Sequence, residues 1–93
     1  MTTLFIPAPL RHLTDGAEQV ALEIPPGQRR TVGQLLAELE QRHPGLEAAL
    51  LENGQLTPHL AVFIDGEQAG LGLQARVSQE NEVYFLVPVA GGG

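Results

Sequence analysis

The sequence predicts an α+β fold in which one main helix packs on one face of a mixed sheet of four to five strands. Two observations predict this class: a leucine stripe with helical spacing between residues 31 and 42, and short strand-like apolar runs on both sides of it. A helix with one apolar side has to bury that side against a sheet. The length of 93 residues fits one domain, and an apolar fraction of 43% is too high for a disordered chain.

Two strands are expected before the helix. Residues 3–6 form a β-prone run that ends at Pro7 and Pro9. Residues 10–17 are expected to form a loop. In residues 20–24 apolar side chains occupy every second position, which predicts a strand with one buried face.

The main helix is expected to begin at Thr31 and to end before Pro44. Thr31 and Gln34 have the spacing of a capping box, in which each side chain bonds the backbone N–H of the other residue. A second, shorter helical turn is expected over residues 46–51. The apolar stripe of the main helix consists of Val32, Leu35, Leu36 and Leu39.

The remaining strands follow the helix. Residues 60–64 are a continuous apolar run, which predicts a strand that is buried on both faces or central in the sheet. The turn at residues 65–66 predicts a hairpin with residues 67–69. Residues 70–73 are expected to be irregular with two anchoring leucines, and residues 83–86 to form the last strand. Two strands, a crossing helix and returning strands describe the β-grasp, or ubiquitin-like, fold.

The C-terminal residues differ in composition from the rest of the chain. The last strand continues into Val87-Pro88-Val89-Ala90 and three glycines. We therefore assign residues 1–90 to the single domain and residues 91–93 to a flexible glycine tail. An extended glycine segment has no Cβ atoms, so it can enter a channel that is too narrow for other residues. This property suits a protein whose reactive group is its own C-terminal carboxylate. The alternative is a frayed end or an expression artefact.

Charge and composition exclude several classes of function. A net charge of −6, from eleven acidic residues and five arginines, argues against a nucleic-acid partner. It favours a basic protein partner, although acidity also keeps a small protein in solution. No apolar run approaches the roughly 20 residues of a membrane span. No secretory signal is recognisable, and we expect a cytoplasmic protein.

The chain offers few residues for catalysis. Without cysteine it forms neither disulfides nor thiolate nucleophiles. Its histidines, His12, His43 and His59, lack the spacing of metal ligands, so no metal site is expected. No glycine-rich phosphate loop and no Ser/His/Asp arrangement is recognisable. The chain is therefore not expected to be an enzyme.

Over nearly its whole length the chain resembles the ThiS/MoaD family of ubiquitin-like sulfur carriers. The specific part of the resemblance is residues 87–92 after the last strand. The Pro-Gly-Leu segment at residues 44–46, the Gly-Leu stretch at residues 72–73 and the Ala-Gly-Gly ending at residues 90–92 are most similar to those of the carrier used for cysteine synthesis. Supporting segments in the body are Leu10-Arg11, Thr31-Val32 with Leu35-Leu36, Pro44-Gly45-Leu46, Leu71-Gly72-Leu73 and Val83.

The resemblance implies that the chain is a protein co-substrate. An ATP-dependent adenylyltransferase related to ubiquitin-activating enzymes would convert the C-terminal carboxylate into an acyl-adenylate, and sulfur would then displace AMP to leave a thiocarboxylate. A sulfur-accepting synthase would use that sulfur to make cysteine, a cofactor or a thio-metabolite. The chain itself is expected to bind no cofactor, because ATP belongs to the partner. The alternative is a ubiquitin-like modifier joined to lysines of other proteins, and a third class is a binding module with an inert tail.

The ending departs from the family in one residue. The usual ending is two glycines, whereas here Gly93 follows Gly92. The reactive carboxylate is therefore that of Gly93, or that of Gly92 if a protease first trims the tail, or Gly93 is foreign to the native protein. Gly91 and Gly92 would thread into the partner.

A docking patch is predicted on the last strand. If Val83 and Phe85 face the helix, the residues between and after them face outward. In similar proteins this open face meets both the activating enzyme and the sulfur acceptor. The alternative is an ordinary scatter of surface apolar groups. The predicted patch comprises Tyr84, Leu86, Pro88 and Val89.

Overall fold

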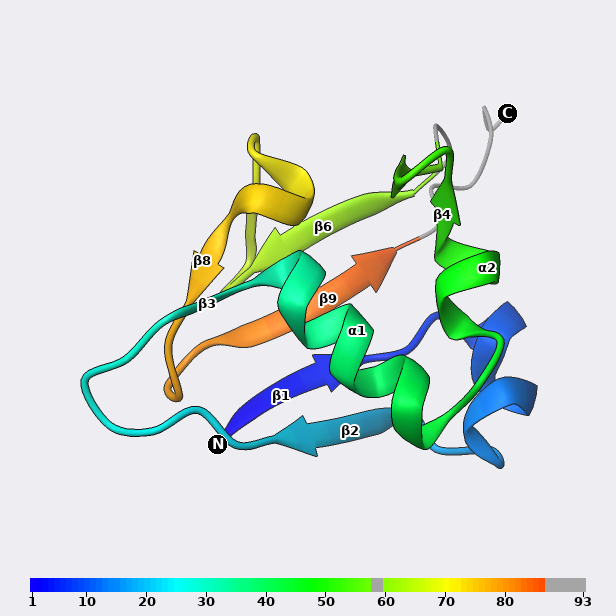
Figure 1. The fold of residues 1–93 in the computed structure, drawn as a ribbon, viewed down its shortest axis with the longest axis horizontal. Coiled ribbons are helices and arrows are strands. Elements are labelled where there is room, and N and C mark those ends of the chain that lie inside the picture. The colour runs from blue at the N-terminus through cyan, green and yellow to red at the C-terminus, as the bar shows by residue number, and fades with distance from the viewer. Residues whose placement is uncertain (58–59, 87–93) are drawn as a thin grey trace.

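The computed structural model describes residues 1–57 and 60–86, and it has one helix lying across one face of a five-stranded sheet (Figure 1). The strand order is β2-β1-β9-β6-β7. The central pair, β1 and β9, is parallel, and the other neighbours are antiparallel. The prediction of a mixed sheet with one main helix is confirmed. The strands are β1 (Thr2–Phe5), β2 (Gln19–Leu22), β6 (Ala61–Ile64), β7 (Glu67–Gln68) and β9 (Glu82–Leu86).

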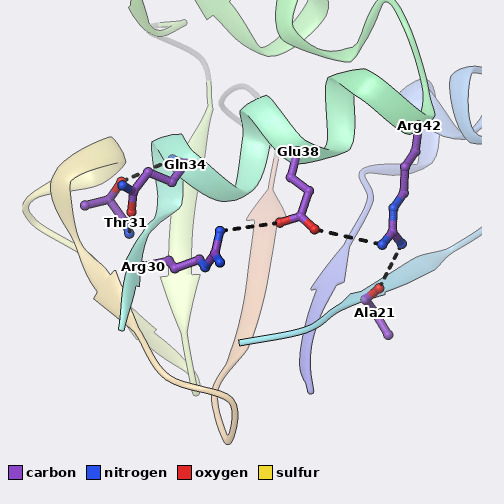
Figure 2. A network of polar contacts seen from close by, with 6 residues as sticks. All are labelled: Ala21, Arg30, Thr31, Gln34, Glu38 and Arg42. Atoms are coloured by element: carbon purple, nitrogen blue, oxygen red, sulfur yellow. Dashed lines mark hydrogen bonds and ion pairs between the residues drawn. The ribbon is translucent and has the colours of Figure 1, made fainter. Parts of the chain in front are cut away.

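The main helix, α1 (Val32–Arg42), begins at the predicted capping box (Figure 2). The Gln34 backbone N–H donates to Thr31 Oγ1 at 3.1 Å, and the Thr31 N–H donates to Gln34 Oε1 at 2.9 Å. These two bonds satisfy donors that a helix start otherwise leaves without partners. The helix start is therefore fixed by local chemistry as well as by packing.

The core lies between α1 and one face of the sheet. All four apolar residues of the predicted helical stripe are completely buried. On the sheet side they face the residues that alternate inward along the strands, and this layer supplies most of the apolar burial that stabilises a domain of this size. The buried apolar residues at inward positions of the three central strands are Leu4, Val62, Val83 and Phe85.

A 3-10 helix, η1 (Ala8–Thr14), replaces the loop that was expected over residues 10–17. A proline lies in its first turn, and Thr14 Oγ1 bonds the backbone oxygens of Arg11 and Ala17 at 3.1 and 2.8 Å. Because a 3-10 turn of this length leaves little periodicity in the sequence, side-chain bonds such as those of Thr14 fix it instead.

The second helix, α2 (Leu46–Leu50), forms where a helical turn was predicted, and Glu40 from α1 holds its start. The Glu40 carboxylate accepts the N–H groups of Glu47 at 2.9 Å and Gly45 at 3.0 Å. These bonds, the one from Glu47 first, lower the pKa of Glu40 because they favour its charged form. Gly45 has φ +106°, a conformation that side chains with a Cβ rarely adopt.

Short strand pairs tie the loops to this frame. The pair β3 (Arg30–Thr31) with β8 (Arg76–Val77) joins the start of α1 to the chain after β7. The pair β4 (Leu51–Glu52) with β5 (Gln55–Leu56) closes the turn after α2. Neither pair was predicted, because two residues are too few to show an alternation.

In the second half of the chain one prediction is confirmed and one is wrong. Strand β6 lies between β9 and β7, so of the two alternatives for residues 60–64 the central strand is correct. Only Val62 is fully buried, so the strand is not buried on both faces. Residues 70–73 contain part of a 3-10 turn, η2 (Gly72–Gln74), and Leu71 is 71% exposed, so it does not anchor the loop. Leu73 does pack against the core. Among the described residues, no helix is long and apolar enough to cross a membrane.

Candidate functional site

The sheet face opposite α1 carries the described part of the predicted docking patch. Along β9, Val83 and Phe85 are 0% and 1% exposed on the helix side. Tyr84 and Leu86 alternate with them on the open side, where Tyr84 is half-buried and Leu86 is 45% exposed. The orientation expected for these two side chains is therefore observed.

An aromatic row crosses the open face at the level of Tyr84. The strand register places Phe5 of β1 and Phe63 of β6 directly beside Tyr84, one on each side. The rings of Phe5 and Tyr84 are stacked, with centroids 4.1 Å apart and planes 5° from parallel. Both phenylalanines are half-buried, so part of each ring remains accessible to a partner. Stacked pairs of this kind are worth about 0.5–1.5 kcal/mol beyond the area that they bury.

A second apolar pair lies next to this row, at the end of the strand. Leu86 of β9 is opposite Ala61 of β6 on the same face. On the other side of the aromatic row, the next outward positions of β9 and β1 are polar, where Glu82 pairs with Thr3. We call the apolar area the open-face patch. It consists of Phe5, Ala61, Phe63, Tyr84 and Leu86.

The open-face patch and the tail are parts of the same run of chain. Strand β9 ends at Leu86, and residues 87–90 connect it to the predicted glycine tail. A partner that covers the patch therefore contacts the strand from which the chain continues toward the tail. The remaining predicted site residues, which are Pro88, Val89, Gly91, Gly92 and Gly93, lie outside the described residues.

Sequence reasoning missed Phe5 and Phe63. Each of them lies within a predicted strand, Phe5 in residues 3–6 and Phe63 in residues 60–64. The sequence does not show which strands are neighbours in the sheet. Only the register of β1 and β6 against β9 brings the two rings to Tyr84. A pattern search for aromatic residues at outward strand positions would have found them as candidates.

Other chemistry is sparse in the part of the chain that the structure describes. Within residues 1–57 and 60–86, no three His, Cys, Asp or Glu side chains are grouped so as to hold a metal ion. His12 lies in η1 and His43 follows α1, and neither belongs to such a group, whereas His59 is outside the described residues. Among the described residues, the open-face patch is therefore the main candidate for a functional surface, because packing within the chain does not explain its exposed apolar side chains.

Comparison with the models of known protein families identifies the family of this chain. The model of the ThiS family matches residues 4–92. The chain belongs to the ThiS family. The match begins in β1 and runs to the second of the three terminal glycines, so it includes the open-face patch and all of the tail except Gly93.

Individual relatives agree with this placement. Small archaeal modifier protein 3 of Haloferax volcanii is 34% identical over 64 residues, which is 67% of this chain and 70% of the relative. A chain of the Amycolatopsis orientalis BexX/CysO complex has a TM-score of 0.84 and 30% identity, with 99% of this chain and 100% of that chain covered. SAMP1 of Haloferax volcanii has a TM-score of 0.77 and 28% identity, with 98% of each chain covered.

These relatives are ubiquitin-like proteins of two kinds. Some are sulfur carriers and others are protein modifiers, and both kinds share the β-grasp fold. Both kinds are small ubiquitin-like proteins and not catalysts, which fits the expectation that this chain is not an enzyme. The β-grasp prediction and the resemblance to the ThiS/MoaD family are thus confirmed.

Proposed function

We propose that this ThiS-family protein is a sulfur carrier whose C-terminal glycine is activated with ATP and converted to a thiocarboxylate. The observation that supports this function best is the family match, which extends through the domain into the glycine tail. The similarity to the BexX/CysO complex favours transfer of the sulfur to a small-molecule synthase, for cysteine, a cofactor or a thio-metabolite. We place the reaction in the cytoplasm, where ATP is available.

The chemistry requires nothing from the side chains of this protein. The terminal carboxylate attacks the α-phosphorus of ATP, and pyrophosphate leaves. A sulfur nucleophile then attacks the carbonyl carbon, a C–S bond forms, and the C–O bond to AMP breaks. A carboxylate is a poor electrophile until AMP becomes its leaving group, which is why the carrier needs an adenylyltransferase as its first partner. The acceptor synthase is its second partner.

The open-face patch supplies the docking surface in this proposal. Its three aromatic side chains lie in one row across β1, β9 and β6, and together they offer the rigid apolar area that is typical of binding hot spots. Pro88 and Val89 follow on the same chain and would extend the contact toward the partner's active site. Gly91 and Gly92 would thread into its channel, because only residues without Cβ pass a narrow one.

The identity of the reactive glycine is part of the proposal. The family match ends at Gly92, whereas the sequence ends at Gly93. We propose that Gly93 carries the thiocarboxylate as it stands, or that Gly92 does so after a protease removes the last residue. The two cases differ in the mass of the product.

Reconstitution tests this function. The purified chain is incubated with ATP, sulfide and an adenylyltransferase that activates ThiS-family proteins, and the product is alkylated with iodoacetamide. We expect one alkyl group on the C-terminal residue, and none on a chain that lacks residues 91–93. The shortened chain keeps the whole open-face patch, so it is a matched control for docking. Absence of labelling while ATP–pyrophosphate exchange proceeds would contradict the carrier function.

A protein modifier is the second candidate, favoured by the similarity to small archaeal modifier protein 3. In that function the acyl-adenylate passes to a lysine amine of another protein and forms an isopeptide bond. An epitope-tagged chain expressed in its own host would then appear in high-mass conjugates, and truncation of the tail would remove them. A host that shows thiocarboxylate and no conjugates excludes this candidate.

A further inference from the structure

The outer edge of β2 is a place where another strand can add. Among the described strands, β2 has β1 as its neighbour on one side and none on the other. The Ile6 N–H donates to the Glu18 oxygen at 2.9 Å, in register with the β1–β2 ladder. Because hydrogen-bonded pairs alternate in an antiparallel ladder, the backbone groups of Gln19 and Ala21 point away from β1. Unpaired edge groups of this kind are a template for pairing with another chain.

A side chain from α1 closes this edge (Figure 2). Arg42 Nη1 donates to the backbone oxygen of Ala21 at 3.3 Å. Its other terminal nitrogen lies 3.9 Å from Glu38 Oε1, and Arg30 lies 4.0 Å from Glu38 Oε2. Two arginines thus share one carboxylate, and one of them covers the central outward carbonyl of the strand.

The covered edge is complementary to itself. In an antiparallel pair of two β2 strands, Ala21 of one copy lies opposite Ala21 of the other, and both outward N–H and C=O groups are satisfied. The same register places Gln19 opposite Glu23, an amide against a carboxylate. It also covers the exposed flank of the half-buried Val20. Self-complementarity of this kind is what a two-fold interface requires.

We propose that the outer edge of β2 is a self-association edge for a second copy of this chain, and that Arg42 keeps it closed. The bond to Ala21 and the ion pair to Glu38 are both long, and the Arg42 side chain is 50% exposed. The closure is therefore weak enough for one substitution to open it. This property is independent of the tail and of the proposed sulfur chemistry.

The test is the association of the full chain in solution, measured by sedimentation equilibrium. The native chain is expected to be a monomer, and Arg42→Ala to form dimers with an association constant at least roughly tenfold higher, because a charge-assisted bond to the edge carbonyl is lost. Arg76→Ala is the matched control, since it makes the same charge change on β8, away from this edge. It is expected to remain monomeric.

A second substitution locates the interface. Arg42→Ala/Ala21→Pro removes the outward N–H at the centre of the edge without touching the bonds to β1, and it is expected to restore the monomer. In Arg42→Ala, slowed hydrogen exchange at Gln19 and Ala21 with rising concentration gives the same information without the proline. A folded Arg42→Ala that stays monomeric, a control that dimerises equally, or a dimer whose exchange slows elsewhere would overturn the proposal.

Discussion

The two faces of the five-stranded sheet are built from alternate residues of the same strands, yet they carry different chemistry. On the face that α1 covers, Leu4, Val83 and Phe85 are at most 1% exposed. On the open face the register lines up Phe5 and Tyr84, which are only half-buried. The covered face is explained by packing alone. The open face retains large apolar side chains that packing within the chain does not require.

This difference shows that the alternation of inward and outward side chains along one strand can serve both stability and binding. Inward residues contribute the burial that a domain of 93 residues needs, and outward residues remain available for a partner. Substitutions on the two faces should therefore change different quantities. Inward substitutions should change the free energy of unfolding, and outward substitutions should mainly change the affinity for the activating enzyme.

The largest effect on stability is expected for Leu36→Ala, which breaks the covered face. Leu36 is completely buried in the apolar stripe of α1. Loss of its side chain leaves a cavity that costs about 2–5 kcal/mol of unfolding free energy. Urea unfolding followed by circular dichroism measures it. Thiocarboxylate formation should fall only with the folded fraction, and a specific loss of activation in fully folded protein would contradict the division between the faces.

Tyr84→Ala breaks the open face. We expect its affinity for the adenylyltransferase to fall at least roughly tenfold, as at a binding hot spot. The unfolding free energy should fall by only about 1 kcal/mol, the value of a stacked aromatic pair. Titration calorimetry and urea unfolding measure the two quantities. Tyr84→Phe keeps the stack with Phe5 and should behave as the native chain; equal binding by Tyr84→Ala would remove Tyr84 from the docking surface.

Thr31→Ala sharpens the comparison, because it changes the helix layer and touches neither face of the sheet. The substitution removes the acceptor for the Gln34 N–H at the start of α1. The expected cost is about 1 kcal/mol of unfolding free energy. Thr31→Ser, which keeps the hydroxyl, is the control. The affinity for the adenylyltransferase should not change with either substitution, and a change would mean that the start of α1 belongs to the docking surface.

The smallest expected effect is the pH dependence contributed by Glu40. Backbone bonds from Glu47 and Gly45 lower its pKa in the folded chain below the ordinary value of 4.5. A lowered folded pKa means that the carboxylate stabilises the fold above its unfolded pKa, and that this contribution is lost as the pH falls through the folded pKa.

Thermal unfolding between neutral pH and pH 3 measures this contribution. Glu40→Gln should reduce the loss of melting temperature on acidification, and Glu52→Gln, on the short strand β4, is the control. An unchanged acid profile in Glu40→Gln would show that the charge of Glu40 does not contribute to the loss of stability at low pH.

The sequence predicted those parts of the fold that show a period. The stripe on α1, the capping box and the outward orientation of Tyr84 and Leu86 all follow from spacing along one element. Of the five two-residue strands that the structure describes, β7 was predicted from the turn before it, and the other four were missed because their pairing is set by the tertiary frame. The exposure of Leu71 was missed for the same reason, since composition does not show which leucine of a loop turns inward.

The candidate site likewise has a part that the sequence predicted and a part that only the structure shows. The tail follows the last strand within a few residues, so the sequence alone pointed to both. The contribution of Phe5 and Phe63 depends on which strands flank β9, and that became visible only in the register. The role of the terminal glycines is chemical, and a direct measurement on the tail is its test.

The intact mass of the protein isolated from its own host tests the central claim most directly. The carrier function predicts a species heavier by the replacement of one oxygen by one sulfur, on the full chain if Gly93 is reactive, or on a chain one glycine shorter if Gly92 is. If the unmodified mass is the sole species, even when sulfide and an adenylyltransferase that activates ThiS-family proteins are supplied, the account of this protein as a sulfur carrier is contradicted.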